Sequence, residues 1–215
     1  MRLIVIRHGE TYANTINRQK IAMYIGAMNT ELTNLTDNGI LQAKKLFSDS
    51  DVKTISTMYC SDLKRSYDTA ILIRPDLKPV IVPELRERSY GVFEGRYFED
   101  VEREYKDYLN GKPAGVFCSD FNEKALGGES YSDVCRRIDS FLSSLNFAKD
   151  DTIGIVTHGH VIRCIFYKLL DIRPKERILQ MRTGNCIPYI FEGKSRQGIR
   201  LISHDIDCLL NDKWF

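Results

Sequence analysis

Residues 2–11 read RLIVIRHGET, an apolar run that ends in an Arg-His pair followed by glycine. The β-branched side chains between Leu3 and Ile6 predict a buried strand. The turn after such a strand is where α/β proteins place their reactive groups. Arg7 and His8 therefore bring an imidazole next to a fixed positive charge, an arrangement that suits binding and attacking a phosphate.

Composition bounds the class of protein. The chain has 215 residues, 43% of them hydrophobic and 28% charged, enough for one domain over residues 1–215. Its net charge of +2 favours neither nucleic acid nor a membrane surface as a partner. No apolar run approaches the ~20 residues that span a bilayer, and there is no signal-peptide pattern. Six scattered cysteines without a C-x-x-C pair predict free thiols in the cytoplasm. We expect a monomer or homodimer.

Strands and helices alternate along the chain. Further strands are predicted at residues 55–60, 80–82, 152–157, 186–192 and 198–203, and helices at 11–20, 36–46 with Thr36 as N-cap, 61–72 with Ser61 or Asp62 as N-cap, 130–145 and 161–170. This alternation predicts a three-layer α/β/α fold with a mostly parallel central sheet. Residues 84–128, with a helix near 98–109, are rich in Gly, Arg, Glu and Tyr and predict a lid-like insertion.

A second strand ends in the same way as the first. Residues 153–159 read IGIVTHG, so His158 and Gly159 also follow an apolar run. Neighbouring parallel strands end at the same edge of a sheet, and two imidazoles can therefore converge on one crevice. Arg65 follows the strand at 55–60, where its fork of donors can meet phosphate oxygens. The alternative for Arg65 is a solvated helix face.

Two other kinds of site are disfavoured. His158 and His160 are spaced like a pair of metal ligands, but no carboxylate or cysteine cluster flanks them, so no metal is predicted. No G-x-G-x-x-G motif follows any predicted strand, which argues against a dinucleotide-dependent oxidoreductase.

Several motifs follow in a fixed order. They are the opening Arg-His-Gly-Glu-Thr, L-T-x-x-G at 35–39, S-x-L-x-R-x-x-x-T-A at 61–70, L-x-E and G-x-x-E-G between 85 and 95, Gly-Gly-Glu-Ser at 127–130 and Thr-His-Gly at 157–159. Each is weak alone, but the set spans residues 2 to about 190. In these motifs the chain resembles the histidine phosphatase superfamily, which includes the cofactor-dependent phosphoglycerate mutases. The resemblance implies a phosphoglycerate mutase-like fold.

The resemblance also implies roles for the residues at the strand ends. His8 would be the nucleophile that forms a phosphohistidine, with a neutral ring whose other nitrogen donates to a backbone carbonyl. Arg7, Arg65 and His158 would surround the phosphate oxygens and stabilise their charge. No metal and no cofactor would be needed, since the arginines supply the positive charge.

Two further residues match the superfamily pattern less specifically. Asn14 would donate to the phosphate, although it can equally bond to its own backbone in a turn. Glu87 would protonate the leaving oxygen and then activate water. Its run of charged neighbours is also typical of an ordinary surface, and Glu84 is the nearest substitute.

The residues expected to contact the rest of the substrate distinguish a mutase from a phosphatase. Arg88 looks mutase-like and is a candidate substrate contact. Phe98 stands where a mutase carries a substrate-binding lysine, and His160 stands where mutases have asparagine. We therefore expect a metal-independent phosphomonoesterase for small phosphorylated metabolites. A cofactor-dependent phosphoglycerate mutase is the first alternative. A non-catalytic phosphate- or phosphoprotein-binding domain is the second, disfavoured because His8 and the candidate acid are both present.

The segment after the first predicted helix is longer than in compact phosphatases. We expect the loop at 20–35 to lie over the pocket, where loops set specificity, and Lys20 to contact an anionic substrate. The predicted substrate contacts are Asn14, Lys20, Arg88, Gly159 and His160.

Overall fold

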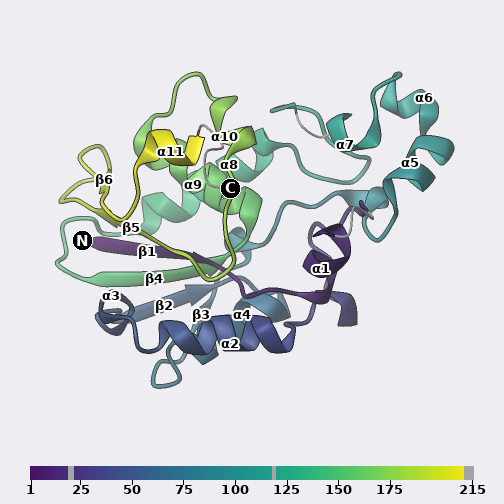
Figure 1. The fold of residues 1–215 in the computed structure, drawn as a ribbon. Helices are drawn as coiled ribbons and strands as arrows, with labels where there is room; N and C mark the ends of the chain where they lie inside the picture. The colour runs from purple at the N-terminus through teal and green to yellow at the C-terminus, as the bar shows by residue number, and fades with distance from the viewer. Residues whose placement is uncertain (19–21, 118–119, 211–215) are drawn as a thin grey trace.

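A central sheet organises the computed structural model, which describes residues 1–18, 22–117 and 120–210 (Figure 1). Its strands are β1 (Arg2–Arg7), β2 (Thr57–Cys60), β3 (Val80–Ile81), β4 (Thr152–Thr157), β5 (Pro188–Glu192) and β6 (Arg200–Leu201). Their order is β3-β2-β4-β1-β5-β6. Strands β3, β2, β4 and β1 run parallel to one another. Strand β5 pairs antiparallel with β1, and β6 pairs antiparallel with β5. The prediction of a mostly parallel α/β sheet is confirmed.

Strand β1 holds the layers together. Its side chains from Leu3 to Ile6 are fully buried, and they alternate between two apolar clusters, as the two-residue period of a strand requires. One cluster includes α8 (Tyr131–Ser144) and α9 (Gly159–Leu170), and the other includes α2 (Asp37–Leu46) and α4 (Lys64–Ile73). Figure 1 shows these two helix layers on opposite faces of the sheet.

Two helix starts differ in outcome. The Thr36 side chain accepts from the Gly39 amide and caps α2, as predicted. The prediction that Ser61 or Asp62 caps α4 is wrong, because the helix begins at Lys64 with Leu63 as its N-cap. Ser61 Oγ lies 2.7 Å from His158 Nε2 instead. Helix α9 begins at Gly159, two residues earlier than expected.

Short elements complete the chain. They are α1 (Tyr12–Arg18), α3 (Ser50–Lys53), α10 (Arg177–Gln180), α11 (Ile206–Leu210) and the 3-10 turns Glu31–Thr33, Pro83–Leu85 and Gly91–Phe93. The helix predicted near 98–109 is two helices, α5 (Phe98–Glu104) and α6 (Lys106–Leu109), followed by α7 (Ala114–Phe117). Among the described residues, no helix is long and apolar enough to cross a membrane.

A separate apolar cluster supports the segment at 84–128. Phe93, Val101 and Phe117 belong to it, and Tyr24 joins them from the loop before α2. The Tyr24 amide donates to Arg96 O, and its hydroxyl donates to Ala114 O. Figure 1 shows α5, α6 and α7 beyond the carboxyl end of β1. The loop and the insertion therefore pack together on the side of the sheet where reactive groups are expected.

Candidate active site

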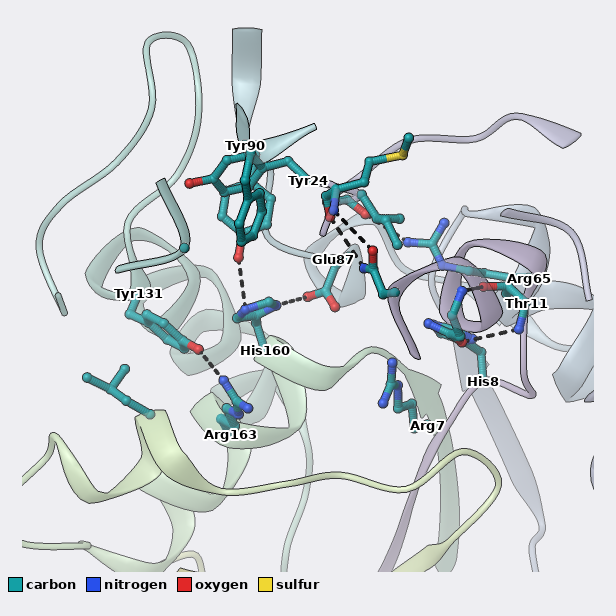
Figure 2. Close-up of a pocket in the computed structure, with 18 residues that line it drawn as sticks. Arg7, His8, Thr11, Tyr24, Arg65, Glu87, Tyr90, Tyr131, His160 and Arg163 are labelled. Carbon is teal, nitrogen blue, oxygen red and sulfur yellow. Dashed lines mark hydrogen bonds and ion pairs between the residues drawn. The ribbon is translucent and has the colours of Figure 1, made fainter. Parts of the chain in front are cut away.

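A cavity of about 340 Å³ opens at the carboxyl end of β1 (Figure 2). Six predicted site residues line it, namely Arg7, His8, Asn14, Arg65, Glu87 and His160. Its other walls come from α1, the loop before α2, the insertion, α8, α9 and α10, through residues that include Met23, Tyr24, Tyr90, Phe98, Tyr131, Arg163 and Leu179. Residues far apart in sequence are thus brought to one pocket.

The turn after β1 packs directly against the first turn of α2. A Cβ at Gly9 would lie 2.5 Å from Gly39 O, and a Cβ at Gly39 would lie 2.1 Å from Glu10 O. Only glycine permits so close an approach of two backbones. Glu10 Oε1 accepts from Thr36 Oγ1 at 2.9 Å and from Asn38 Nδ2 at 3.1 Å. The Glu10 carboxylate therefore fixes the turn.

His8 is buried and has a defined tautomer. Its Nδ1 lies 2.7 Å from Gly9 O, and because a carbonyl only accepts, Nδ1 carries the proton. The lone pair is then on Nε2. Burial, followed by the charges of Arg65 and Arg7, holds the pKa of His8 well below its usual value. The ring is a neutral base with one free nitrogen.

His158 packs against His8, is fully buried and is not among the residues that line the cavity. Its ring centroid lies 5.1 Å from that of His8. Ser61 Oγ accepts from the Leu63 amide at 3.3 Å, and His158 Nε2, at 2.7 Å, is the one acceptor among the described residues for the Ser61 hydroxyl proton. The His158 proton is then on Nδ1, a buried atom with no hydrogen-bond partner among the described residues. Burial and then Arg65 lower the pKa of His158, so the ring offers a neutral N–H donor.

Backbone carbonyls hold the two arginines. Arg7 Nη1 donates to Thr183 O at 2.7 Å. Arg65 donates from Nη1 to Met28 O at 2.7 Å and from Nη2 to Gly26 O at 2.9 Å. Arg65 is only 2% exposed, so the solvated helix face is excluded. Burial lowers the pKa of Arg65 to about 10, and the side chain stays charged at neutral pH.

Glu87 supplies the carboxylate of the cavity. Its Oε1 accepts from the Arg88 amide at 2.9 Å and lies 3.3 Å from His160 Nδ1. Burial raises the pKa of Glu87, but His160, His158 and the Arg88 amide outweigh it and hold that pKa well below its usual value. Glu84 is exposed and does not line the cavity. Of the two candidate carboxylates, only Glu87 reaches the site.

A sequence model of the histidine phosphatase superfamily (branch 1) matches residues 3–203. The chain belongs to this superfamily. It is 32% identical over 176 residues to the adenosylcobalamin/alpha-ribazole phosphatase of Salmonella typhimurium, with 80% of this chain and 81% of that protein covered. Over 185 residues it is 28% identical to a metal-independent phosphoserine phosphatase of Arabidopsis thaliana, with 82% of this chain and 72% of that protein covered.

A solved structure shares the fold. The alpha-ribazole phosphatase of Shigella flexneri superimposes with a TM-score of 0.78 at 27% identity, with 95% of this chain and 96% of that chain covered. The phosphoglycerate mutase-like fold that the motifs predicted for this histidine phosphatase is therefore confirmed.

Asn185 is a site residue of this histidine phosphatase that the sequence did not reveal. Its Nδ2 donates to His8 O at 2.8 Å and to Asn14 Oδ1 at 3.3 Å. Asn14 Oδ1 also accepts from the Thr11 amide at 3.1 Å. The Asn14 oxygen is thereby occupied, which leaves its NH₂ group for the cavity. The only signal was a short polar run, Thr-Gly-Asn at 183–185, before a closing strand.

The structure does not confirm two of the predicted substrate contacts, Arg88 and Lys20. Arg88, the mutase-like residue, is fully buried and does not line the cavity. It donates to Glu129 O at 2.8 Å and to Glu123 O at 2.9 Å. The structure thus corrects the prediction for Arg88, since this side chain braces the insertion. Lys20 lies outside the described residues.

The remaining predicted contacts lie at the start of α9. A Cβ at Gly159 would meet Thr183 Oγ1 at 3.2 Å, so the backbone there runs close to the neighbouring loop. His160 has its nitrogens near Glu87 and Tyr90. Among the described residues, no three His, Cys, Asp or Glu side chains are grouped so as to hold a metal ion.

Proposed function

We propose that this histidine phosphatase is a phosphomonoesterase in which His8 accepts the phosphoryl group. The observation that carries the proposal is the contact of His8 Nδ1 with Gly9 O, which leaves the Nε2 lone pair beside Arg7 and Arg65. A neutral imidazole next to two cations attracts a phosphate and attacks it without first losing a proton. The superfamily and its phosphatase relatives support hydrolysis of phosphate esters.

The first half of the reaction forms the phosphohistidine. Arg7, Arg65 and the His158 Nδ1–H bind the phosphate oxygens, and Nε2 of His8 attacks phosphorus as the ester bond breaks. Glu87 gives a proton to the leaving oxygen. The carboxyl is ionised in the free protein, so this proton arrives with a substrate bound as the monoanion, whose second pKa is about 6.

The second half releases phosphate. Glu87, ionised again, takes a proton from water, and the oxygen of that water attacks phosphorus. The P–N bond breaks, and His8 recovers its neutral ring with Nδ1 still held by Gly9 O. The same carboxyl thus serves as acid and then as base.

Hydrolysis is favoured over mutase activity. Arg88, the residue that looked mutase-like, braces the insertion away from the cavity. We propose that small phosphorylated metabolites are the substrates, on the ground that the cavity has a volume of only about 340 Å³ and is lined on one side by Tyr90, Phe98 and Gly115 of the insertion. The five cysteines that the structure describes are free thiols, which supports the proposed cytoplasmic location.

Steady-state hydrolysis of p-nitrophenyl phosphate tests the proposal. We expect His8→Ala to lower kcat at least about 1,000-fold without loss of the folded state by circular dichroism. Activity should persist in EDTA, since arginines supply the positive charge. A panel that includes α-ribazole phosphate, phosphoserine, and 3-phosphoglycerate with 2,3-bisphosphoglycerate separates phosphatase from mutase. Retained turnover in His8→Ala would refute the nucleophile, and phosphate binding without turnover by the wild type would indicate a binding domain.

A further inference from the structure

His160 has a place in the cavity that the proposed reaction does not use. It lies in the first turn of α9, and its side chain is 24% exposed. Its Nδ1 lies 3.3 Å from Glu87 Oε1, and its Nε2 lies 3.1 Å from the Tyr90 hydroxyl. Figure 2 shows the ring between these two side chains. His160 thus joins the candidate acid to the insertion.

The Glu87 carboxylate sets the tautomer of His160. An ionised carboxylate only accepts, so the proton of the neutral ring is on Nδ1, which faces Glu87, and Nε2 accepts from the Tyr90 hydroxyl. Nδ1 lies 3.3 Å from Glu87 Oε1, a charge contact that falls short of a regular hydrogen bond in this structure, and the Arg88 amide donates to the same oxygen at 2.9 Å. One oxygen of the carboxyl therefore faces two N–H groups.

The second oxygen of Glu87 lies near the backbone of Gly159. A Cβ at Gly159 would lie 3.9 Å from Glu87 Oε2 and 3.9 Å from Arg7 Nε, so both atoms approach the same point of the chain. No donor among the described residues is hydrogen-bonded to Oε2. The two oxygens thus have different surroundings, one anchored and one open to the cavity.

We propose that His160 is a positioning residue for Glu87, whose Nδ1 proton holds Oε1 so that Oε2 exchanges the proton with the leaving group and with water. The inference rests on the proposed function, in which Glu87 is the acid and base. An acid that rotates loses the alignment with the leaving oxygen on which proton transfer depends.

The charges around His160 agree with this role. The titratable groups that face it from the neighbouring elements are Glu87, Arg88, Tyr90, Tyr131 and Arg163. Burial, with Arg163 and Arg88, lowers the pKa of His160 more than Glu87 raises it. The ring is therefore neutral near pH 7, and its Nδ1–H can serve Glu87 as a hydrogen-bond donor but not as the source of the catalytic proton.

A matched pair of amide variants tests the inference. In His160→Asn the amide nitrogen takes the place of Nδ1 and keeps the donor to Glu87, whereas in His160→Gln it takes the place of Nε2 and loses it. The substrates are p-nitrophenyl phosphate, whose leaving group needs no acid, and β-glycerophosphate, whose alkoxide does. The measurement is kcat and KM for each substrate from pH 4 to 9, with circular dichroism as a control for folding.

We expect His160→Gln to lower kcat for β-glycerophosphate about 100-fold and to leave p-nitrophenyl phosphate within about fivefold, with little change in KM. His160→Asn should stay within about fivefold of the wild type on both substrates. Loss of the donor also raises the pKa of Glu87, so the descending limb of the kcat profile in His160→Gln should move to higher pH. Tyr90→Phe removes the contact with Nε2, and its kcat for β-glycerophosphate should lie between those of His160→Asn and His160→Gln.

Three results would overturn the inference: equal losses in the Asn and Gln variants, equal losses on both substrates, or a rise in KM with kcat unchanged. The last would make His160 a substrate contact. Failure of the proposed function has a different signature, since the wild type would then not hydrolyse either ester or His8→Ala would remain active. A wild type that hydrolyses both esters and an inactive His8→Ala, together with equal Asn and Gln variants, would refute the role of His160 alone.

Discussion

The floor and the roof of the cavity are built in different ways. The floor consists of Arg7, His8, Arg65 and Glu87, which line the cavity, with His158 buried against the His8 ring, and apolar clusters on both faces of the sheet support it. The roof consists of residues 22–28 with 90–117 and 120–128, held by a smaller cluster of mostly aromatic side chains. Arg65 joins the two, because its guanidinium donates to two carbonyls of the roof.

This difference assigns separate tasks to the two regions. Reactive groups need fixed positions, which a sheet buried on both faces provides. We expect the roof to contact the part of the substrate that differs from one phosphomonoester to another, since its loops can change without disturbing the sheet. We therefore expect changes in the floor to abolish turnover, and changes in the roof to alter the preference among substrates.

The largest expected effect in this comparison belongs to Arg65→Ala. The change removes a buried cation from the phosphate site and two hydrogen bonds to the roof, so kcat/KM for p-nitrophenyl phosphate should fall about 100- to 1,000-fold. Lys64→Ala, at the exposed neighbouring position, is the control and should keep near-normal activity. Equal effects of the two variants would show that Arg65 acts only through general surface charge.

Glu87→Gln should have the next largest effect, and it should depend on the leaving group. The amide cannot donate and accept a proton in turn, so turnover of β-glycerophosphate should fall about 100-fold, and more than that of p-nitrophenyl phosphate. Glu84→Gln is the matched control, because its carboxylate lies outside the cavity. A larger loss of turnover in Glu84→Gln than in Glu87→Gln would show that Glu84, and not Glu87, is the acid.

A change in the roof should have a smaller effect. The Phe98 ring lines the cavity and lies 4.6 Å from that of Tyr24. Phe98→Ala should change the ranking of KM values across a phosphomonoester panel by up to about tenfold, since one lost apolar contact costs about 1–3 kcal/mol, with kcat for p-nitrophenyl phosphate nearly constant. Val92→Ala, in the roof but away from the cavity, should change neither. A collapse of kcat in Phe98→Ala would contradict the division of tasks.

The smallest expected effect is on how the melting temperature changes with pH. His8 and His158 have lowered pKa values in the folded protein, whereas an unfolded histidine has a pKa of about 6.5. Below that pH the unfolded chain binds protons that the folded chain does not, so the melting temperature should fall between pH 7 and pH 5. His8→Asn removes one of these groups and should make the decline shallower. An identical decline in the wild type and in His8→Asn would show that the buried ring does not titrate as described.

The two regions also differ in how well the sequence predicted them. Strands β1 and β4 are continuous apolar runs that end in His-Gly, so their core positions followed from pattern alone. Arg88 was misplaced, because successive side chains of this irregular segment point in different directions, so that Glu87 lines the cavity while Arg88 donates to Glu129 O and Glu123 O. Asn185 could not be found, since its contact with His8 spans 177 residues and depends on how the antiparallel strands return. Ser61 was taken for a helix cap because no local signal shows that His158 lies within hydrogen-bond distance.

The central claim is that His8 carries the phosphoryl group. Rapid acid-free quenching of the wild type during turnover of p-nitrophenyl phosphate, followed by intact-protein and peptide mass spectrometry, measures it directly. We predict a transient phosphoryl adduct on the peptide that contains His8, absent from His8→Ala and long-lived in Glu87→Gln, where no base activates water. An adduct on another residue, or turnover with no adduct in any of the three proteins, would contradict the account.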